Sequence, residues 1–251
     1  PEMSRGLGDV YKRQLYRYHY FFTFQNSNLD MRKVLFDKMG VAYEQLEELA
    51  FLVFYGFSQE VQDKLEESTI QKILEKAFSD TDAVRLVSIE KDDYKKELFS
   101  LYKDNIIDQY YGLKIQYLYP FISGKDFTYI PSPYLVVNAV TESMLNRVTF
   151  RDNKLRRAIG KEVIESYLYN IVRQLDTVTW ISPELLYKKG KDKLLTSDVI
   201  AAEGDNVIFY DTKAITPSLK LRKFDVAEIE ADIEIYAEDV IQIYNQINNY
   251  L

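Results

Sequence analysis

The 251-residue sequence contains no cysteine, and several other residue types and motifs are scarce or missing. Without cysteine the protein has no disulfides, no catalytic thiolate and no cysteine-based zinc site. His19 is the only histidine, which disfavours histidine-based catalytic triads and zinc centres that activate water. The sequence also lacks a glycine-rich loop of the kind that cradles nucleotide phosphates. These absences exclude or disfavour several large classes of enzyme.

Long apolar runs are missing as well. The longest candidate, residues 49–57, is far shorter than the roughly 18 residues that a membrane-spanning helix needs, so we expect no membrane partner. The sequence shows no secretory signal, which predicts a cytoplasmic location. The hydrophobic content of 47% is nevertheless enough to bury a core, either in one large domain or in two small ones.

Charge is unevenly distributed along the chain. The net charge of −7 argues against a protein that coats nucleic acid by bulk electrostatics, which requires clustered lysine and arginine. From Leu186 to Lys223, however, eight basic residues stand against five acidic ones, a local balance of +3. The following stretch from Asp225 to Asp239 holds seven acids and no base. The positive segment suits a phosphate-containing substrate, although lysines on a solvated loop would give the same pattern.

Residues 1–14 resemble the translated sequencing-adapter read-through found at the ends of metagenomic fragments, because they end in the sequence DVYKRQ. We therefore set these residues aside when predicting the fold, and we expect the natural protein to begin further upstream. Residues 15–130 show helical periodicity, with a first apolar stripe through Leu35, Tyr43, Leu46 and Leu49. The irregular, proline-containing segment near Pro131 predicts a boundary to a second domain, residues 131–251.

Two long helices and a hairpin are predicted in that second domain. One helix covers residues 155–175, and its apolar stripe is Ile159, Val163, Tyr167, Ile171 and Leu175. The other covers residues 226–251, although partial alternation in residues 230–235 leaves a strand open there. The segment Ser182-Pro-Glu184 is typical of a helix start or of a turn.

The hairpin is the most informative feature, and it is predicted within residues 196–213. If its turn is Gly204-Asp205, Glu203 faces Asn206 and Asp198 faces Asp211. Directly opposite residues have Cβ atoms roughly 4.5 to 5.5 Å apart, so two such carboxylates repel unless a cation lies between them. Lys213 follows Asp211 by two residues and therefore projects from the same face.

This pattern predicts a divalent metal site with an adjacent ammonium group. The Asp-x-Lys spacing alone is weak, since Asp93 and Asp152 begin further copies of it. A surface hairpin with a solvated ion pair is the competing interpretation.

The order of these residues resembles the PD-(D/E)xK nuclease superfamily from Gly160 to Tyr250. The matching segments are GKEVIESY at residues 160–167, SD at 197–198 and FYDTK at 209–213, while QINNY at 246–250 resembles the Gln-x-x-x-Tyr element of the RecB-like branch. The resemblance implies an α/β fold of mixed helices and strands. It places a restriction endonuclease-like domain, with a small mixed sheet flanked by helices, after the helical region.

The resemblance also implies Mg²⁺-dependent hydrolysis of phosphodiester bonds in DNA, for example in restriction, phage defence or repair. Mn²⁺ is an alternative ion, and RNA stays open as a substrate. The implied catalytic residues are Glu165, Asp198, Asp211 and Lys213. The implied metal ligands are Asp198, Asp211, the carbonyl of Thr212, and Glu165. Gln246 and Tyr250 are expected to contact the substrate. Glu162 is the alternative to Glu165, which we favour for its Glu-x-Tyr context.

A non-enzymatic protein is the main competing hypothesis. In that case the chain is a helical interaction or scaffold protein whose nuclease-like domain is degenerate and only binds nucleic acid or another chain. The helical region would then provide the surface for a protein partner or for an oligomer.

Overall fold

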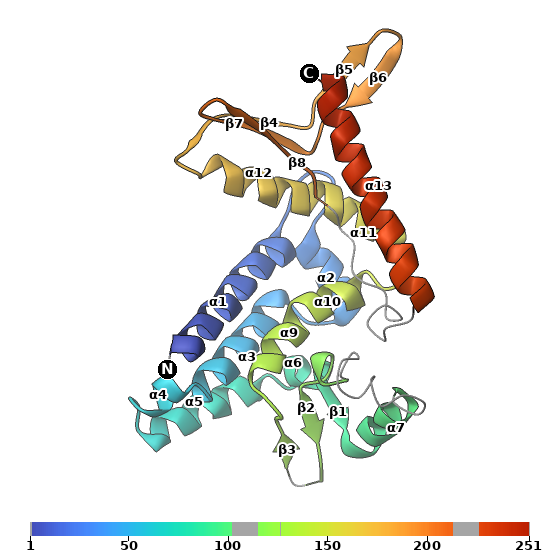
Figure 1. Cartoon of the computed structure of the whole chain (residues 1–251). Coiled ribbons are helices and arrows are strands. Elements are labelled where there is room, and N and C mark those ends of the chain that lie inside the picture. The colour runs from blue at the N-terminus through green and yellow to red at the C-terminus, as the bar shows by residue number, and fades with distance from the viewer. Residues whose placement is uncertain (1, 102–114, 126, 213–225, 251) are drawn as a thin grey trace. The chain divides into compact units, whose positions relative to one another are not determined.

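The computed structural model describes residues 2–101, 115–125, 127–212 and 226–250. It contains both helices and small sheets flanked by helices, which confirms the mixed α/β class. The chain divides into two compact units, Pro1–Arg151 and Asp152–Leu251, called here the N-terminal and C-terminal units (Figure 1).

The N-terminal unit is mainly helical. Its described helices are α1 (Glu2–Thr23), α2 (Met31–Met39), α3 (Tyr43–Gly56), α4 (Gln59–Gln62), α5 (Glu67–Ser79), α6 (Thr81–Leu86), α7 (Lys91–Leu101), the 3₁₀ turn η1 (Ile115–Tyr117), α9 (Tyr134–Val140) and α10 (Glu142–Val148). A small sheet of order β1-β2-β3 joins them and consists of β1 (Ser88–Glu90), β2 (Phe121–Ser123) and β3 (Thr128–Tyr129).

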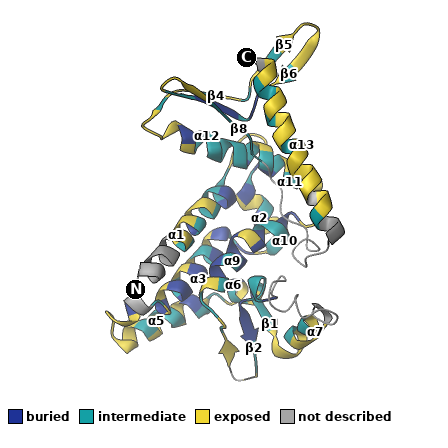
Figure 2. Ribbon diagram, viewed as in Figure 1, coloured by how far each residue is buried: buried dark blue, intermediate teal, exposed yellow. Residues whose placement is uncertain are grey.

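The predicted first apolar stripe forms the core of this unit. Leu35, Tyr43, Leu46 and Leu49 are all buried, and Figure 2 shows the buried residues gathered between the helices. The periodic pattern is interrupted at Gly40, whose φ of +73° ends α2 in the left-handed conformation that glycine adopts without strain.

Two expectations for this part of the chain were wrong. The predicted helical region also contains the β1-β2-β3 sheet, because strands of two or three residues are too short to produce a detectable period. The boundary lies after Arg151 rather than near residue 130, because α9 and α10 pack with the N-terminal helices. Two residues of the segment that was set aside make contacts in this unit, since Tyr11 stacks on Tyr134 and the Gln14 amide donates to Thr141 Oγ1 at 2.7 Å.

The C-terminal unit combines a three-stranded antiparallel sheet, a two-stranded hairpin and helices. Its described elements are α11 (Asn153–Ile159), the π-helical turn η2 (Gly160–Ile164), α12 (Glu165–Arg173), β4 (Val178–Pro183), β5 (Leu186–Lys189), β6 (Asp192–Leu195), β7 (Val199–Glu203), β8 (Asn206–Tyr210) and α13 (Val226–Tyr250). The sheet has the order β4-β7-β8 and is antiparallel throughout, whereas a mixed sheet was expected.

The β7–β8 hairpin has the predicted register. Glu203 pairs with Asn206 across the turn, and the ladder ends at the pair Val199 and Tyr210. Gly204 has a φ of +56°, which a two-residue hairpin turn with glycine in first position requires. The turn therefore brings Asp198 and Asp211 to the same end of two neighbouring strands.

Ser182 and Pro183 belong to strand β4, so the predicted helix start or turn at Ser182-Pro-Glu184 was wrong. Pro183 ends β4 and is the partner of Val199 in β7. Beyond it, β5 and β6 pair with each other, so β4–β5 and β6–β7 run side by side as one long, interrupted hairpin.

Helix α13 confirms the predicted C-terminal helix and excludes the alternative strand at residues 230–235. Figure 1 shows its C-terminal end beside the β5–β6 hairpin. Among the helices of the described residues, none is both long enough and apolar enough to cross a membrane.

Candidate metal centre

Three carboxylates lie at the same end of the β4-β7-β8 sheet. Asp198 immediately precedes β7, and Asp211 immediately follows β8, one step beyond the pair Val199 and Tyr210. Glu184 immediately follows β4 and continues past the pair Pro183 and Val199. Since the strand order is β4-β7-β8, each strand contributes one acidic side chain to this end of the sheet.

The regular pairing of the two strands is interrupted at Asp198. The pair Pro183 and Val199 is followed by a hydrogen bond of 3.0 Å from Thr196 N to Leu185 O. Between these points one strand has only Glu184, while the other has Ser197 and Asp198. Two residues opposite one is the composition of a β-bulge, a feature that re-aims side chains and is frequent next to active sites.

The fourth carboxylate, Glu165, comes from the first residue of α12. Its backbone N–H bonds to Gly160 O, five residues earlier, which is the hydrogen bond of a π-helical turn. The turn adds one residue to the helical repeat. The inward-facing side of the helix therefore steps by five residues from Val163 to Leu168, and then by four to Val172. The predicted stripe through Tyr167 and Ile171 lies elsewhere on the helix.

The packing of α12 confirms this shift. Val172 is buried and forms a core cluster with Val199 and Ala201 of β7, and Leu168 packs against this cluster. Ile171, by contrast, is 42% exposed. Glu165 lies three residues before Leu168 and so on the same side of α12 as this cluster. The prediction of Glu165 rather than Glu162 is consistent with this placement.

Glu165 is influenced by the charges of the other three acids. Partial burial is the largest cause that raises the pKa of Glu165 from 4.5 to about 7; the negative charges of Asp198, Glu184 and Asp211 add to it, and Lys161 opposes it. Like charges disfavour the ionised form of a neighbouring carboxyl. The convergence of Glu165, Glu184, Asp198 and Asp211, called here the carboxylate centre, is therefore unfavourable by itself near neutral pH.

Asp198 is held in place by Thr212. Its Oδ2 atom accepts hydrogen bonds from the Thr212 backbone N–H at 2.6 Å and from the Thr212 hydroxyl at 2.7 Å. These contacts fix the carboxylate against the end of β8. The expectation that the Thr212 carbonyl binds metal stays a prediction.

Gln246 supports the same region from α13. Its amide oxygen accepts a hydrogen bond from Ser197 Oγ at 3.0 Å, and its amide nitrogen donates to Thr196 O at 3.3 Å. Gln246 thus anchors α13 to the residues directly before Asp198. Its partner in the predicted motif, Tyr250, lies at the end of α13, and a role for its side chain stays a prediction. Lys213 lies outside the described residues.

The donor set fits a hard divalent cation. Mg²⁺ prefers oxygen ligands and usually takes only one or two carboxylates, with water and substrate phosphate completing its shell. In the part of the chain that the structure describes, no three acidic or histidine side chains are close enough to hold an ion together. If Asp198 and Asp211 both bind one ion, they provide the two carboxylates of such a site, and Glu165 and Glu184 add negative charge.

Glu184 is the residue that the sequence analysis missed. The proline before it favoured a turn or a helix start, and a strand there was not considered. The signal was nevertheless present, because the apolar and β-branched run Val178 to Ile181 is typical of a strand. Pairing that strand with β7 would have placed Glu184 next to Asp198.

Comparison with models of protein families, with curated proteins and with solved structures gives no match for this chain. The resemblance to the PD-(D/E)xK superfamily therefore stays a prediction from the sequence.

The raised pKa of Glu165 predicts a pH-dependent stability of the metal-free protein. Because the folded state binds this proton more tightly than the unfolded state, the contribution is fully present below pH 4.5 and is lost as the pH rises towards 7. We expect the urea midpoint in EDTA to fall between pH 5 and pH 8. Trp180, the only tryptophan, lies in β4 and reports the unfolding of the C-terminal unit by fluorescence.

Glu165→Gln is expected to flatten this dependence, and Glu162→Gln serves as the matched control on the same helical segment. An equally steep decrease in the Glu165→Gln variant would show that Glu165 is not the group that titrates.

Proposed function

We propose that the C-terminal unit is a metal-dependent nuclease that hydrolyses phosphodiester bonds of DNA, with Mg²⁺ as the ion and Mn²⁺ as a substitute. The observation that carries the proposal is the carboxylate centre, in which one acid at the end of each of three adjacent strands acts, together with partial burial, to raise the pKa of Glu165 on α12. A cation that binds there would reduce the repulsion between the carboxylates and so stabilise the folded protein.

Asp198 and Asp211 are the proposed metal ligands. They lie directly beyond the pair Val199 and Tyr210, which ends two neighbouring strands whose register is set by a tight turn. The two hydrogen bonds from Thr212 hold the Asp198 carboxylate in one orientation. Once bound, the ion would polarise the scissile phosphate and lower the pKa of water.

Glu165 and Lys213 have complementary proposed roles. Glu165 would accept a proton from the attacking water. Lys213 would offset the negative charge that develops on the phosphate in the transition state. Glu184 would strengthen the negative field that attracts the cation.

The direct experiment is a cleavage assay with the purified full chain. Labelled single-stranded DNA, double-stranded DNA and RNA are incubated with Mg²⁺, with Mn²⁺ or with EDTA. The proposal predicts DNA cleavage that requires one of the ions and stops in EDTA. A protein that binds neither ion and cleaves none of the substrates would support the scaffold hypothesis instead.

A further inference from the structure

The β5–β6 hairpin carries an unusual concentration of positive charge. Lys188, Lys189, Lys191 and Lys193 are all exposed and fall within the ten residues from Leu186 to Leu195, where Asp192 is the only acid. The balance of +3 (four lysines against one aspartate) contrasts with −7 for the whole chain. We call the segment Leu186–Leu195 the lysine hairpin.

Two of these lysines stand directly opposite each other. Lys188 pairs with Lys193 in the ladder, whereas Lys189 pairs with Asp192. Like charges at directly opposite positions destabilise a strand pair. Within the described residues, Lys188, Lys191 and Lys193 form no hydrogen bond or ion pair. An anion bound across the hairpin would relieve this repulsion.

Lys189 has a different, structural role. Its Nζ atom donates to the carbonyl oxygens of Asn248 and Asn249 at 3.4 and 3.2 Å, and it lies 3.3 Å from Asn249 Oδ1. Carbonyls in the last turn of a helix have no partner within the helix, and lysine commonly satisfies them. This contact holds the lysine hairpin beside the end of α13.

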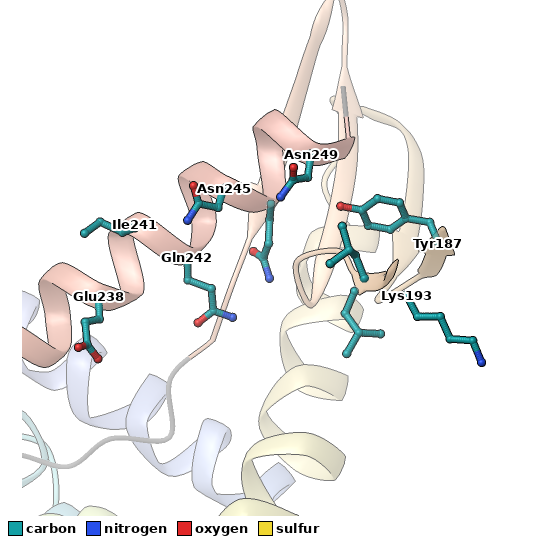
Figure 3. A pocket seen from close by; sticks show the side chains of 10 residues that line it. Tyr187, Lys193, Glu238, Ile241, Gln242, Asn245 and Asn249 are labelled. Carbon is teal, nitrogen blue, oxygen red and sulfur yellow. The ribbon is translucent and has the colours of Figure 1, made fainter. Parts of the chain in front are cut away.

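An open cleft of about 560 Å³ separates the lysine hairpin from α13 (Figure 3). The wall formed by α13 presents the side-chain amides of Gln242, Asn245 and Asn249, and the wall formed by the hairpin presents the ring of Tyr187. Figure 3 shows Tyr187 reaching towards Asn249, while Lys193 extends away from α13. Amides and an aromatic ring are the groups that bind unpaired bases by hydrogen bonding and by stacking.

The cleft is directly connected to the carboxylate centre. Gln246 lines the cleft and also bonds to Ser197, the residue before Asp198. Gln246 therefore links the lining of the cleft to the residue that precedes a proposed metal ligand. Glu238 of α13 also lines the cleft. Its negative charge repels phosphate, so the nucleic acid backbone should avoid this part of the cleft.

We propose that the lysine hairpin and the cleft beside α13 bind a single-stranded nucleic acid segment and direct it to the carboxylate centre. Lys188 and Lys193, on the face of the hairpin away from α13, contact the phosphate backbone, while Tyr187, on the face towards α13, stacks on a base and the amides of α13 contact base edges. The delivery for cleavage rests on the proposed function, whereas the binding itself does not require a metal.

The test measures binding of a fluorescein-labelled 20-nucleotide DNA by anisotropy in EDTA, where cleavage does not occur, over a series of salt concentrations. The triple variant Lys188→Ala, Lys191→Ala and Lys193→Ala is expected to bind at least about tenfold more weakly. Its plot of log affinity against log salt should be shallower by about 2, because each lost phosphate contact removes roughly 0.7 from the slope for a single strand.

The matched control removes the same charge from exposed positions of the N-terminal unit, namely Lys72→Ala, Lys95→Ala and Lys96→Ala. It should bind as the unaltered protein does. Tyr187→Ala should weaken binding at least about fivefold, whereas Tyr187→Phe keeps the stacking ring and should not. Trp180 fluorescence and circular dichroism verify that each variant is folded.

Three outcomes decide the proposal. Loss of affinity in the lysine hairpin variant alone supports it, including when the protein cleaves nothing with Mg²⁺ or Mn²⁺, in which case only the proposed nuclease function fails. Unchanged affinity in that variant overturns the proposed surface even if the protein is an active nuclease. Binding of duplex DNA without binding of the single strand overturns it as well.

Discussion

Replacing Asp211 with asparagine is expected to reduce Mg²⁺-dependent DNA cleavage by on the order of 10³-fold or more, because metal activation contributes several kcal/mol to such reactions. Asn keeps the shape of the side chain but removes half of the charge that Asp198 and Asp211 present to the ion. In EDTA the same variant should be at least as stable as the unaltered protein, since it relieves repulsion in the carboxylate centre.

The combination of lower activity with undiminished stability separates a functional carboxylate from a structural one. Asp198→Asn should behave in the same way, because asparagine can still accept hydrogen bonds from Thr212. Asp93→Asn is the control, since Asp93 begins another Asp-x-Lys sequence and forms only an exposed ion pair with Lys96. Cleavage by Asp211→Asn at the unaltered rate would remove Asp211 from the mechanism.

Replacing Lys213 with alanine is expected to lower the rate of cleavage by about 10²- to 10³-fold, the usual effect of losing one group that stabilises transition-state charge. Mg²⁺ binding should persist, because the carboxylates that hold the ion are intact. Lys213→Ala and Asp211→Asn would thus share a defect in cleavage and differ in metal affinity.

Single-turnover cleavage and Mg²⁺ titration of the two variants test this distinction. Lys95→Ala is the matched control, since Lys95 has the same position in the Asp93-Tyr-Lys95 sequence. If Lys213→Ala cleaves normally, or if it loses Mg²⁺ along with activity, the role assigned to Lys213 is wrong.

The part of the centre that depends on local geometry was predictable from the sequence. A two-residue turn at Gly204-Asp205 determines the register of both strands, and a period of two then determines which residues face each other. For this reason the placement of Asp198 and Asp211 at the same end of two neighbouring strands follows from counting. The long helix ending at Tyr250 was equally accessible, because its apolar periodicity extends over many turns.

The parts that depend on irregular backbone were not predictable. A π-helical turn shifts the buried side of α12 towards Val172, and no residue pattern distinguishes that shift from a regular helix. Similarly, the two strands continue past Pro183 through a bulge at Ser197 and Asp198. Because the sequence does not indicate this bulge, it did not predict that Glu184 lies beside Asp198. The unit boundary at Arg151 depends on long-range packing of α9 and α10, which local periodicity does not contain.

The most direct test of the central claim is whether a divalent cation stabilises the carboxylate centre. The urea midpoint of the full chain is measured by Trp180 fluorescence at pH 7.5, in EDTA and in 10 mM Mg²⁺, at constant ionic strength. The account predicts a higher midpoint with Mg²⁺, in proportion to RT ln(1 + [Mg²⁺]/Kd), and no such increase in Asp198→Asn combined with Asp211→Asn. Equal midpoints for the unaltered protein with EDTA, Mg²⁺ and Mn²⁺ would contradict it.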